Sequence, residues 1–506
     1  MGDRKKGIIM SYTYIIIHAL VNFLYVPILL KYIGNDEYGL YQIVGSLFAY
    51  ITVLESSLET GVLRFYCNAK ASGNLAKMEN TLAIARVIYR VFSVIIAVLC
   101  PFVLVAFRSF YTGALTQTQL AEGTWMLVVL FANLIITMAN SVYLASITAN
   151  EKFAFIKFLA IINQILQPLL CVLILKKYSY AIVVLAIQVI LNIMLCLARF
   201  YYSRHILKVT VALHQWDKKL GKSIIVFAGG ILLAAIADQI FWKADQIILG
   251  KLYSTTVVAI YSIGSQIFTN YSFFGTAVSS VFYPQISRLY KRADANKRIS
   301  DIFIKIGRIS FEVLFLILSG YIIFGREFIS IWVGSEYREA YYIALVVLVP
   351  FTVDLIQNIG LTILQVENKY SFRAKMYFVA ALLNIVSTVI LAKLWGGFGA
   401  ALSTGITMAI TSGLIMNTYY YREIHIDIIG YWKNIGTILI RMIPIMVVIF
   451  ALNLILPTST TFVSLIAKVL IYVAIYIFAM IKWTFNEYEK ELAHKVAMKL
   501  FFWKKV

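Results

Sequence analysis

Long apolar runs separated by short polar connections dominate the chain. Runs of about 20 predominantly apolar residues, the length that crosses a bilayer as a helix, occur fourteen times. We therefore predict an all-α integral membrane protein with fourteen transmembrane helices. Their approximate spans are 7–30, 40–63, 84–107, 125–149, 154–175, 181–201, 223–249, 255–284, 307–325, 340–364, 374–394, 398–420, 435–456 and 463–482.

The connections between these spans carry a strong charge asymmetry. With the N-terminus placed inside, the inside connections hold about four times as many Lys and Arg residues as the outside ones. A missed helix would exchange the two sides for every later connection and destroy this difference. The asymmetry therefore supports the count of fourteen and predicts that both termini are cytoplasmic.

The composition agrees with membrane residence. Of the 506 residues, 61% are hydrophobic and 14% are charged, whereas a soluble domain has roughly 45–50% apolar and about 25% charged residues. A soluble core could not bury so much apolar surface. The net charge of +21 would suggest a nucleic acid partner in a soluble protein. Here the cytoplasmic connections account for it, and we predict no nucleic acid partner.

Two segments of the chain resemble each other. Residues 31–41 align with residues 251–261: each segment opens with Lys and closes on an apolar residue followed by Tyr. They lie 220 residues and six predicted helices apart, and an even number of helices gives repeats of the same orientation. The repeat predicts an N-terminal lobe of residues 1–215, a C-terminal lobe of residues 216–425, and an appended helix pair with a basic tail in residues 426–506.

The start of the chain contains Lys5-Lys6-Gly7, Ser11-Tyr12, Pro27-Ile-Leu-Leu30 and Tyr32-Ile-Gly34-x-x-Glu37-Tyr-Gly39-Leu-Tyr41. These motifs resemble the start of polysaccharide-biosynthesis flippases in the multidrug/oligosaccharidyl-lipid/polysaccharide exporter superfamily. A second stretch, Asp245 to Gly250 followed by Ala259 to Ser262, is similar to the start of that family's second lobe. The resemblance implies two six-helix lobes around a central cavity, alternating access, and a saccharide linked to undecaprenyl pyrophosphate as cargo.

Charged residues inside the predicted spans are candidates for function, because each costs about 2.5–3.5 kcal/mol at a helix centre. Glu55 and Glu59 lie four residues apart on one helical face. They would bind a proton, a cation or sugar hydroxyls, or else be neutralised inside the bundle. In the seventh span, Asp238 would form a gating or coupling pair with Lys243 or with Asp245. The alternative is that Lys243 reaches the outer surface.

Two groups of polar residues suit a wall that accepts sugar hydroxyls. Gln266 and Asn270 lie four residues apart in the eighth span, and Asp354, Gln357 and Asn358 fit one face of the tenth span. The alternative is that these side chains only hydrogen-bond neighbouring helices, which is a purely structural role.

A pyrophosphate headgroup needs cations, and Arg matches the geometry of phosphate oxygens. Arg64, Arg86, Arg90 and Arg288 lie near the inner ends of predicted spans. Arg86 and Arg90 share a helical face where an anionic headgroup would enter. The alternative is that all four follow the cytoplasmic charge bias and contact anionic lipid. The stretch from Lys490 to Lys505, which interleaves Lys with apolar residues, fits a helix at the membrane surface.

The sequence predicts a monomeric transporter of the bacterial cytoplasmic membrane, with lipid-linked saccharide as substrate and H⁺ or Na⁺ as candidate coupling ions. Neither a cofactor nor a metal site is expected, because the four cysteines form no C-x-x-C pair. The rivals are a cation-coupled multidrug antiporter and a peptidoglycan-precursor flippase. A membrane glycosyltransferase or polymerase would need a larger outside loop than this chain has, so we do not expect an enzyme.

Overall fold

The computed structural model describes residues 2–280 and 295–502, and these residues are helical almost throughout. The described part of the chain contains no strand beyond one isolated bridge between Thr112 and Leu115. This confirms the predicted all-α class. The α-helices are α1 (Gly2–Ala71), α2 (Leu75–Tyr111), α3 (Gln117–Ala149), α4 (Phe153–Leu175), α5 (Ala181–Tyr201), α6 (Lys218–Leu252), α7 (Thr255–Ser280), α9 (Ala295–Trp332), α10 (Glu339–Ile356), α11 (Ile359–Val366), α12 (Tyr370–Met408), α13 (Met416–Arg422), α14 (Ile428–Ile455), α15 (Phe462–Ala479) and α16 (Glu487–Phe502).

The helices accommodate the predicted membrane spans. Ten helical segments of the described chain are long and apolar enough to cross a membrane. Two of these segments each contain two predicted spans, because the backbone leaves the helical conformation at Gly34 in α1 and at Trp395 and Gly396 in α12. Gly34 has φ 77°, a conformation that glycine adopts without steric cost. The two predicted spans outside these ten segments are 255–284, which lies in α7 as far as that helix is described, and 307–325, which lies in α9. The protein is therefore a multi-pass membrane protein.

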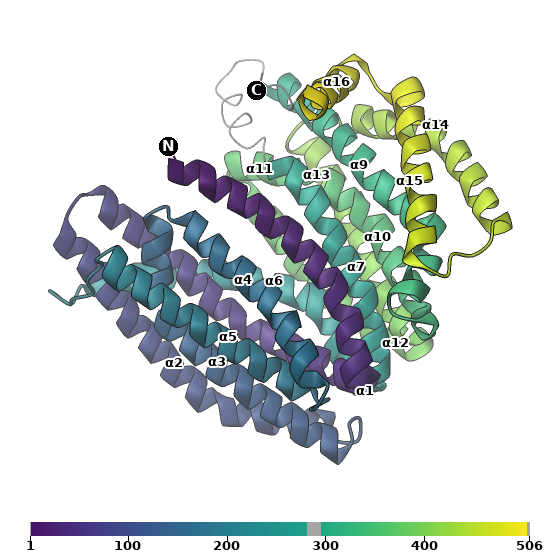
Figure 1. Cartoon of the computed structure of the whole chain (residues 1–506). Coiled ribbons are helices and arrows are strands. Elements are labelled where there is room, and N and C mark those ends of the chain that lie inside the picture. The colour runs from purple at the N-terminus through teal and green to yellow at the C-terminus, as the bar shows by residue number, and fades with distance from the viewer. Residues whose placement is uncertain (1, 281–294, 503–506) are drawn as a thin grey trace. The chain divides into compact units, whose positions relative to one another are not determined.

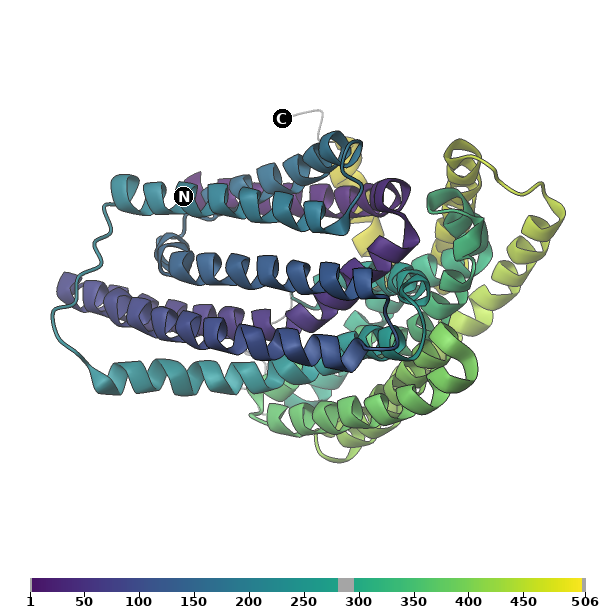
Figure 2. The same cartoon turned by 90° about the horizontal axis from the view of Figure 1, so that it is seen from below.

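The fold divides into two compact units. The first comprises residues 1–262 and 388–397, and the second comprises residues 263–387 and 398–506. In the first unit, α1 packs against α3, α4 and α6, while α3 also packs against α2 and α5. Figures 1 and 2 show α2, α3 and α5 running beside one another. The division into lobes of residues 1–215 and 216–425 with an appended pair stays a prediction.

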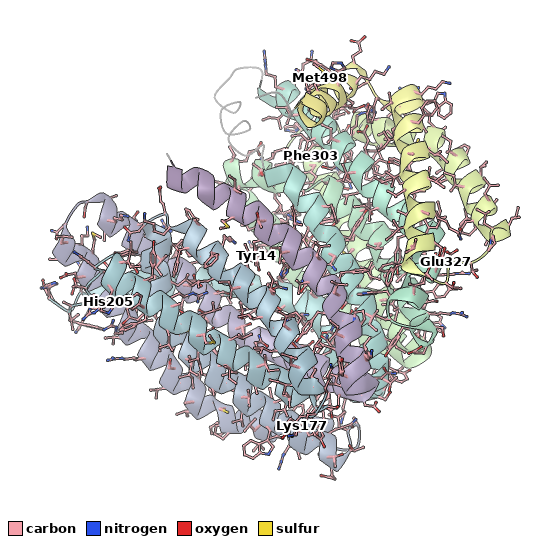
Figure 3. The ribbon with its side chains drawn as sticks, viewed as in Figure 1. Tyr14, Lys177, His205, Phe303, Glu327 and Met498 are labelled. Carbon is pink, nitrogen blue, oxygen red and sulfur yellow. The ribbon has the colours of Figure 1, made fainter. Side chains whose placement is uncertain are left out.

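In the second unit, α9 contacts α10, α14 and α15. Near the end of α9, Glu327 accepts hydrogen bonds from Lys468 Nζ at 3.1 Å and from the backbone N–H of Ser459 at 3.0 Å. Figure 3 shows Glu327 beside the connection between α14 and α15. A largely buried charge needs such partners, so this network holds the α14–α15 pair on α9.

A second buried ion pair holds α16 on α9. Arg308 Nε donates to Glu489 Oε1 at 2.7 Å and Arg308 Nη2 donates to Glu489 Oε2 at 2.9 Å. Both side chains are less than a tenth exposed, at 7% and 2%. Glu489 also accepts from the backbone N–H of Asn486 at 2.7 Å, while the Asn486 side chain accepts from the Glu489 backbone N–H at 2.9 Å. This reciprocal capping starts α16. Its predicted role at the membrane surface stays a prediction.

Candidate functional site

The two glutamates predicted in the second span lie within a polar cluster of the first unit. Glu55 and Glu59 project from the second half of α1, and both are half-buried. Ser141 of α3 donates a hydrogen bond to Glu55 Oε1 at 2.8 Å. The positive charge that acts on both carboxylates is Arg199 of α5. A carboxylate pair, a cation and a hydroxyl from three helices therefore come together.

This cluster contains polar atoms that the described protein leaves unsatisfied. Arg199 Nε and Asn140 Oδ1 are buried and have no hydrogen-bond partner among the described residues, although the Asn140 amide donates to the Cys196 carbonyl oxygen at 2.8 Å. Buried polar atoms are costly unless water or another polar group reaches them. The cluster is therefore suited to water or to a polar ligand such as a hydroxyl-bearing saccharide.

A second polar cluster lies in the second unit around Asp354. Its carboxylate accepts hydrogen bonds from Arg373 at 3.2 Å, from Tyr377 at 2.6 Å and from Ser412 at 2.9 Å. The Arg373 side chain is 11% exposed, and its guanidinium lies over the Tyr377 ring at 4.7 Å. Asp354 is therefore held by Arg373 of α12 and by Ser412, which follows the C-terminal end of α12.

The end of the predicted tenth span differs from expectation. The spacing of Asp354, Gln357 and Asn358 predicts that they share one helical face, but α10 ends at Ile356 and a turn separates it from α11. The Gly360 backbone N–H donates to the Gln357 carbonyl oxygen at 2.8 Å and closes this turn. The Gln357 side chain donates to Asn417 Oδ1 at 2.8 Å. Gln357 thus joins α10 to α13, while Asn358 lies in the turn.

The predicted gating residues of the seventh span lie in different environments along α6. Asp245 is buried and accepts hydrogen bonds from Tyr261 and from Thr388 Oγ1, the latter at 2.9 Å. Asp238 is exposed, and Lys243 is half-buried. Within the described chain Lys243 makes no ion pair with either aspartate. Their gating or coupling role stays a prediction.

The predicted arginines differ in how firmly they are held. Arg86 donates to the Tyr143 hydroxyl at 3.0 Å. The exposed Arg64 lies over the Phe227 ring at 4.2 Å. Arg90, one turn after Arg86 on α2, is exposed. Arg288 lies outside the described residues. Arg86 is therefore pre-positioned by a phenol, whereas Arg90 keeps conformational freedom.

The amides predicted in the eighth span are half-buried. Gln266 and Asn270 lie one turn apart on α7, in the part of that helix that belongs to the second unit. Among the described residues, no group of three or more His, Cys, Asp and Glu side chains is arranged to hold a metal ion.

Most of the chain matches one known protein family. Residues 28–342, well over half of the chain, match the family described as polysaccharide biosynthesis protein. The chain belongs to this family. That finding confirms the resemblance of the repeated segments to polysaccharide-biosynthesis flippases, and the matched region contains Glu55, Glu59 and Arg199.

Among curated relatives, the polysaccharide biosynthesis protein is similar to a probable low-salt glycan biosynthesis flippase, Agl15, of Haloferax volcanii. The two are 21% identical over 213 residues, which cover 42% of this chain and 44% of the relative. The match thus spans less than half of the relative.

Solved structures share the fold. A lipid II flippase, MurJ, in an inward closed conformation has a TM-score of 0.73 at 15% identity, over 94% of this chain and 97% of that one. An inward-facing multidrug resistance transporter of the MATE family has a TM-score of 0.61 at 13% identity, over 82% and 96%. A MOP superfamily transporter from Pyrococcus furiosus has a TM-score of 0.56 at 13% identity, over 81% and 94%.

Two arginines of the polar clusters, Arg199 and Arg373, are not among the site residues that the sequence predicts. Arg199 and Arg373 were counted only as part of the cytoplasmic charge bias, because each lies near the inner end of a predicted span. In the structure Arg199 acts on Glu55 and Glu59, and Arg373 binds Asp354. The sequence offers one local signal for Arg373, because Tyr377 follows it by one helical turn. In the structure Tyr377 donates a hydrogen bond to Asp354, the carboxylate that Arg373 also binds.

Proposed function

We propose that this protein is a flippase that moves an undecaprenyl-pyrophosphate-linked oligosaccharide across the bacterial cytoplasmic membrane for surface polysaccharide biosynthesis. The observation that carries the proposal is the cluster of Glu55, Ser141 and Arg199, with its unsatisfied buried polar atoms, inside a unit of membrane-crossing helices. Membership of the polysaccharide biosynthesis family supports it. The names of two similar proteins also describe flippases.

The proposed transport step separates the headgroup from the lipid tail. The saccharide would contact carboxylate, hydroxyl and amide groups such as Glu55, Ser141 and Asn140, while the polyprenyl chain stays in the bilayer. Arg86 and Arg90 would receive the pyrophosphate, because arginine binds phosphate oxygens through paired N–H donors. Alternating access would follow from the movement of two repeats around this site, as in other transporters built from repeats.

Glu55 and Glu59 would also couple transport to H⁺ or Na⁺. Two carboxylates on one helical face repel each other unless a cation or proton lies near. Arg199 supplies one positive charge for two negative ones, so one carboxylate remains free to exchange a proton or a Na⁺ ion. We further propose that the protein acts as a monomer with both termini in the cytoplasm.

A cation-coupled multidrug antiporter is the second candidate. The carboxylate pair would suit a cationic drug, and the fold is shared with multidrug resistance transporters. Family membership and the arginines Arg86 and Arg90 favour an anionic headgroup. Sugar transfer by the purified protein would instead establish a membrane glycosyltransferase or polymerase.

The deciding experiment measures headgroup translocation in proteoliposomes that contain a fluorescent undecaprenyl-pyrophosphate saccharide. Leaflet exposure is read with a membrane-impermeant quencher for wild type, for Arg86→Ala/Arg90→Ala, and for the exposed control Lys433→Ala. We expect protein-dependent flipping that the double variant loses and the control keeps. Absence of flipping for several headgroups, together with exchange of cations for drugs, would establish the antiporter instead.

A further inference from the structure

A cavity in the second unit is lined by none of the residues of the Asp354 cluster. Its volume is about 680 Å³, within the range of roughly 300–1,000 Å³ that is usual for small-molecule sites. One wall is a single face of α9, and the other is the end of α13 with the connection to α14. The polar side chains that line it are Lys297, Ser300 and Asp301 from α9, and Arg422, His425 and Asp427 from the opposite wall.

The two walls are fastened together. The Asp427 backbone N–H donates to Ser300 Oγ at 3.1 Å, and this bond joins the α13–α14 connection to α9. One turn further along α9, the buried ring of Phe303 packs on Tyr420 and Tyr431, with ring centres 5.6 Å and 5.0 Å away. Phe303 is labelled in Figure 3. The Ser300 hydrogen bond and these ring contacts therefore hold the two walls of the cavity against each other.

Some charged side chains that line the cavity bind other groups of the protein, and others make no ion pair with a described residue. Asp427 is used by the fold, because its side chain accepts the Gly430 backbone N–H at 2.8 Å and caps α14. Lys297 and Arg422 are exposed and make no ion pair with any described residue. His425 also lines the cavity. Apart from the capping aspartate, the lining thus offers two permanent cations and an imidazole against the single carboxylate of Asp301.

The bias of Lys and Arg toward cytoplasmic connections would by itself place Lys297 and Arg422 on the cytoplasmic side of the membrane. It does not require that they converge. The two residues lie 125 positions apart in the sequence, in α9 and α13, and they line the same cavity, whose walls are joined by the hydrogen bond to Ser300. Charge convergence in a cavity of this size is the arrangement of a binding site for a small anion.

We propose that this cavity binds a phosphate ester that carries hydroxyl groups. Lys297, Arg422 and His425 bind the phosphate oxygens, and Asp301 accepts a hydrogen bond from a ligand hydroxyl. Arginine and lysine both bind phosphate, arginine through its paired N–H donors. The ester could be a soluble phosphorylated compound or the headgroup of an anionic lipid. The proposal is independent of the transported substrate, because none of these residues belongs to the polar clusters described above.

Binding is tested with the full-length protein, purified in nanodiscs of phosphatidylcholine, using glycerol 3-phosphate as the soluble probe. Thermal unfolding and isothermal titration are recorded for wild type, Lys297→Gln, Arg422→Gln and the matched control Lys433→Gln. Lys433 is an exposed cation of α14 outside the lining. We expect saturable binding that each lining variant weakens about tenfold, the usual effect of one lost hydrogen bond to a charged group, while the control binds like wild type.

A second set of nanodiscs containing phosphatidylglycerol separates the two sources of the ester. If the lipid headgroup occupies the cavity, glycerol 3-phosphate no longer binds wild type in these discs, and the lipid raises the unfolding temperature of wild type but not of Lys297→Gln/Arg422→Gln. If the ligand is soluble, both kinds of disc give the same affinity. Absence of saturable binding together with no lipid effect would overturn the proposal, as would equal weakening by Lys433→Gln. Unchanged unfolding temperatures of the variants without ligand show that they fold.

Discussion

Thr256 donates a hydrogen bond to Asp36 at 2.9 Å, and the two residues occupy matching positions of the internal repeat. Thr255 donates to the same carboxylate oxygen at 2.7 Å. Asp36 lies between the first and second predicted spans. It therefore contacts the first turn of α7, which contains Thr256, the residue 220 positions later. The internal repeat stays a prediction; the hydrogen bonds show that these two positions lie side by side within the first unit.

The Asp36–Thr256 contact predicts a cross-link that stops transport. In a background without the four native cysteines, Asp36→Cys/Thr256→Cys should form a disulfide on oxidation, because the side chains are in hydrogen-bond contact. If alternating access separates these segments, the oxidised protein loses headgroup flipping and regains it after reduction. Flipping assays with each single cysteine variant provide the control. Full activity of the oxidised double variant would show that this contact persists throughout the cycle.

Gly39 lies in the first repeat where α1 approaches the backbone of Thr255. A Cβ at position 39 would collide with the Thr255 carbonyl oxygen, whereas a Cβ at Gly45 would meet no atom within 4 Å. Gly39→Ala should lower the free energy of unfolding by about 1–3 kcal/mol, the usual cost of overpacking, and Gly45→Ala should not. Thermal unfolding in detergent checks this. Equal unfolding temperatures for the two variants would contradict the close approach.

Removing the Arg308 charge should release α16 from α9. Arg308→Gln leaves Glu489 buried without its cation, which typically costs about 3–5 kcal/mol. We expect a lower unfolding temperature and faster protease cleavage near residues 485–487. The control is Lys495→Gln, which breaks the exposed pair with Glu491 and should leave both measurements unchanged. Slow cleavage of the Arg308 variant would mean that other contacts hold α16.

Glu55 offers a test of coupling that preserves packing. Glu55→Gln keeps an acceptor for Ser141 but removes a negative charge near Arg199. If the carboxylate pair exchanges an ion, this variant should fold like wild type and flip headgroups about tenfold more slowly, with its dependence on a pH or Na⁺ gradient lost. Ser141→Ala removes the hydrogen bond and keeps both charges, so it should keep the gradient dependence even where its flipping rate falls. An unchanged gradient dependence in Glu55→Gln would assign the pair a structural role.

Asp354 should respond as a structural residue, because Arg373 already neutralises it. Asp354→Asn and Arg373→Gln should each lower the unfolding temperature, and the double variant should be more stable than the sum of the single effects predicts. The expected coupling is about 0.5–3 kcal/mol for residues in one network. Flipping rates at a temperature well below unfolding complete the test. A strong loss of flipping in a fully stable Asp354→Asn protein would instead place this carboxylate in the transport site.

The sequence by itself determined the class of this protein and the approximate positions of most of its helices, although not the end of α10 at Ile356. Apolar length is a local property, since a bilayer imposes the same requirement on every span. The runs at 40–63 and 84–107 could therefore be placed without knowledge of any neighbour. The break at Gly34 is likewise local, because a glycine between two apolar runs relieves the steric limit on φ.

Only the tertiary structure decided which charges meet. Glu55 and Arg199 are 144 residues apart, and Arg308 and Glu489 are 181 residues apart. Lys and Arg near helix ends satisfy the cytoplasmic charge bias whatever they contact, so the sequence pattern could not separate Arg199 from its neighbours. Their partners depend on which helices pack together. That choice results from side-chain fit along whole helix faces and from the need to pair every buried charge, and neither can be read from one segment of the chain.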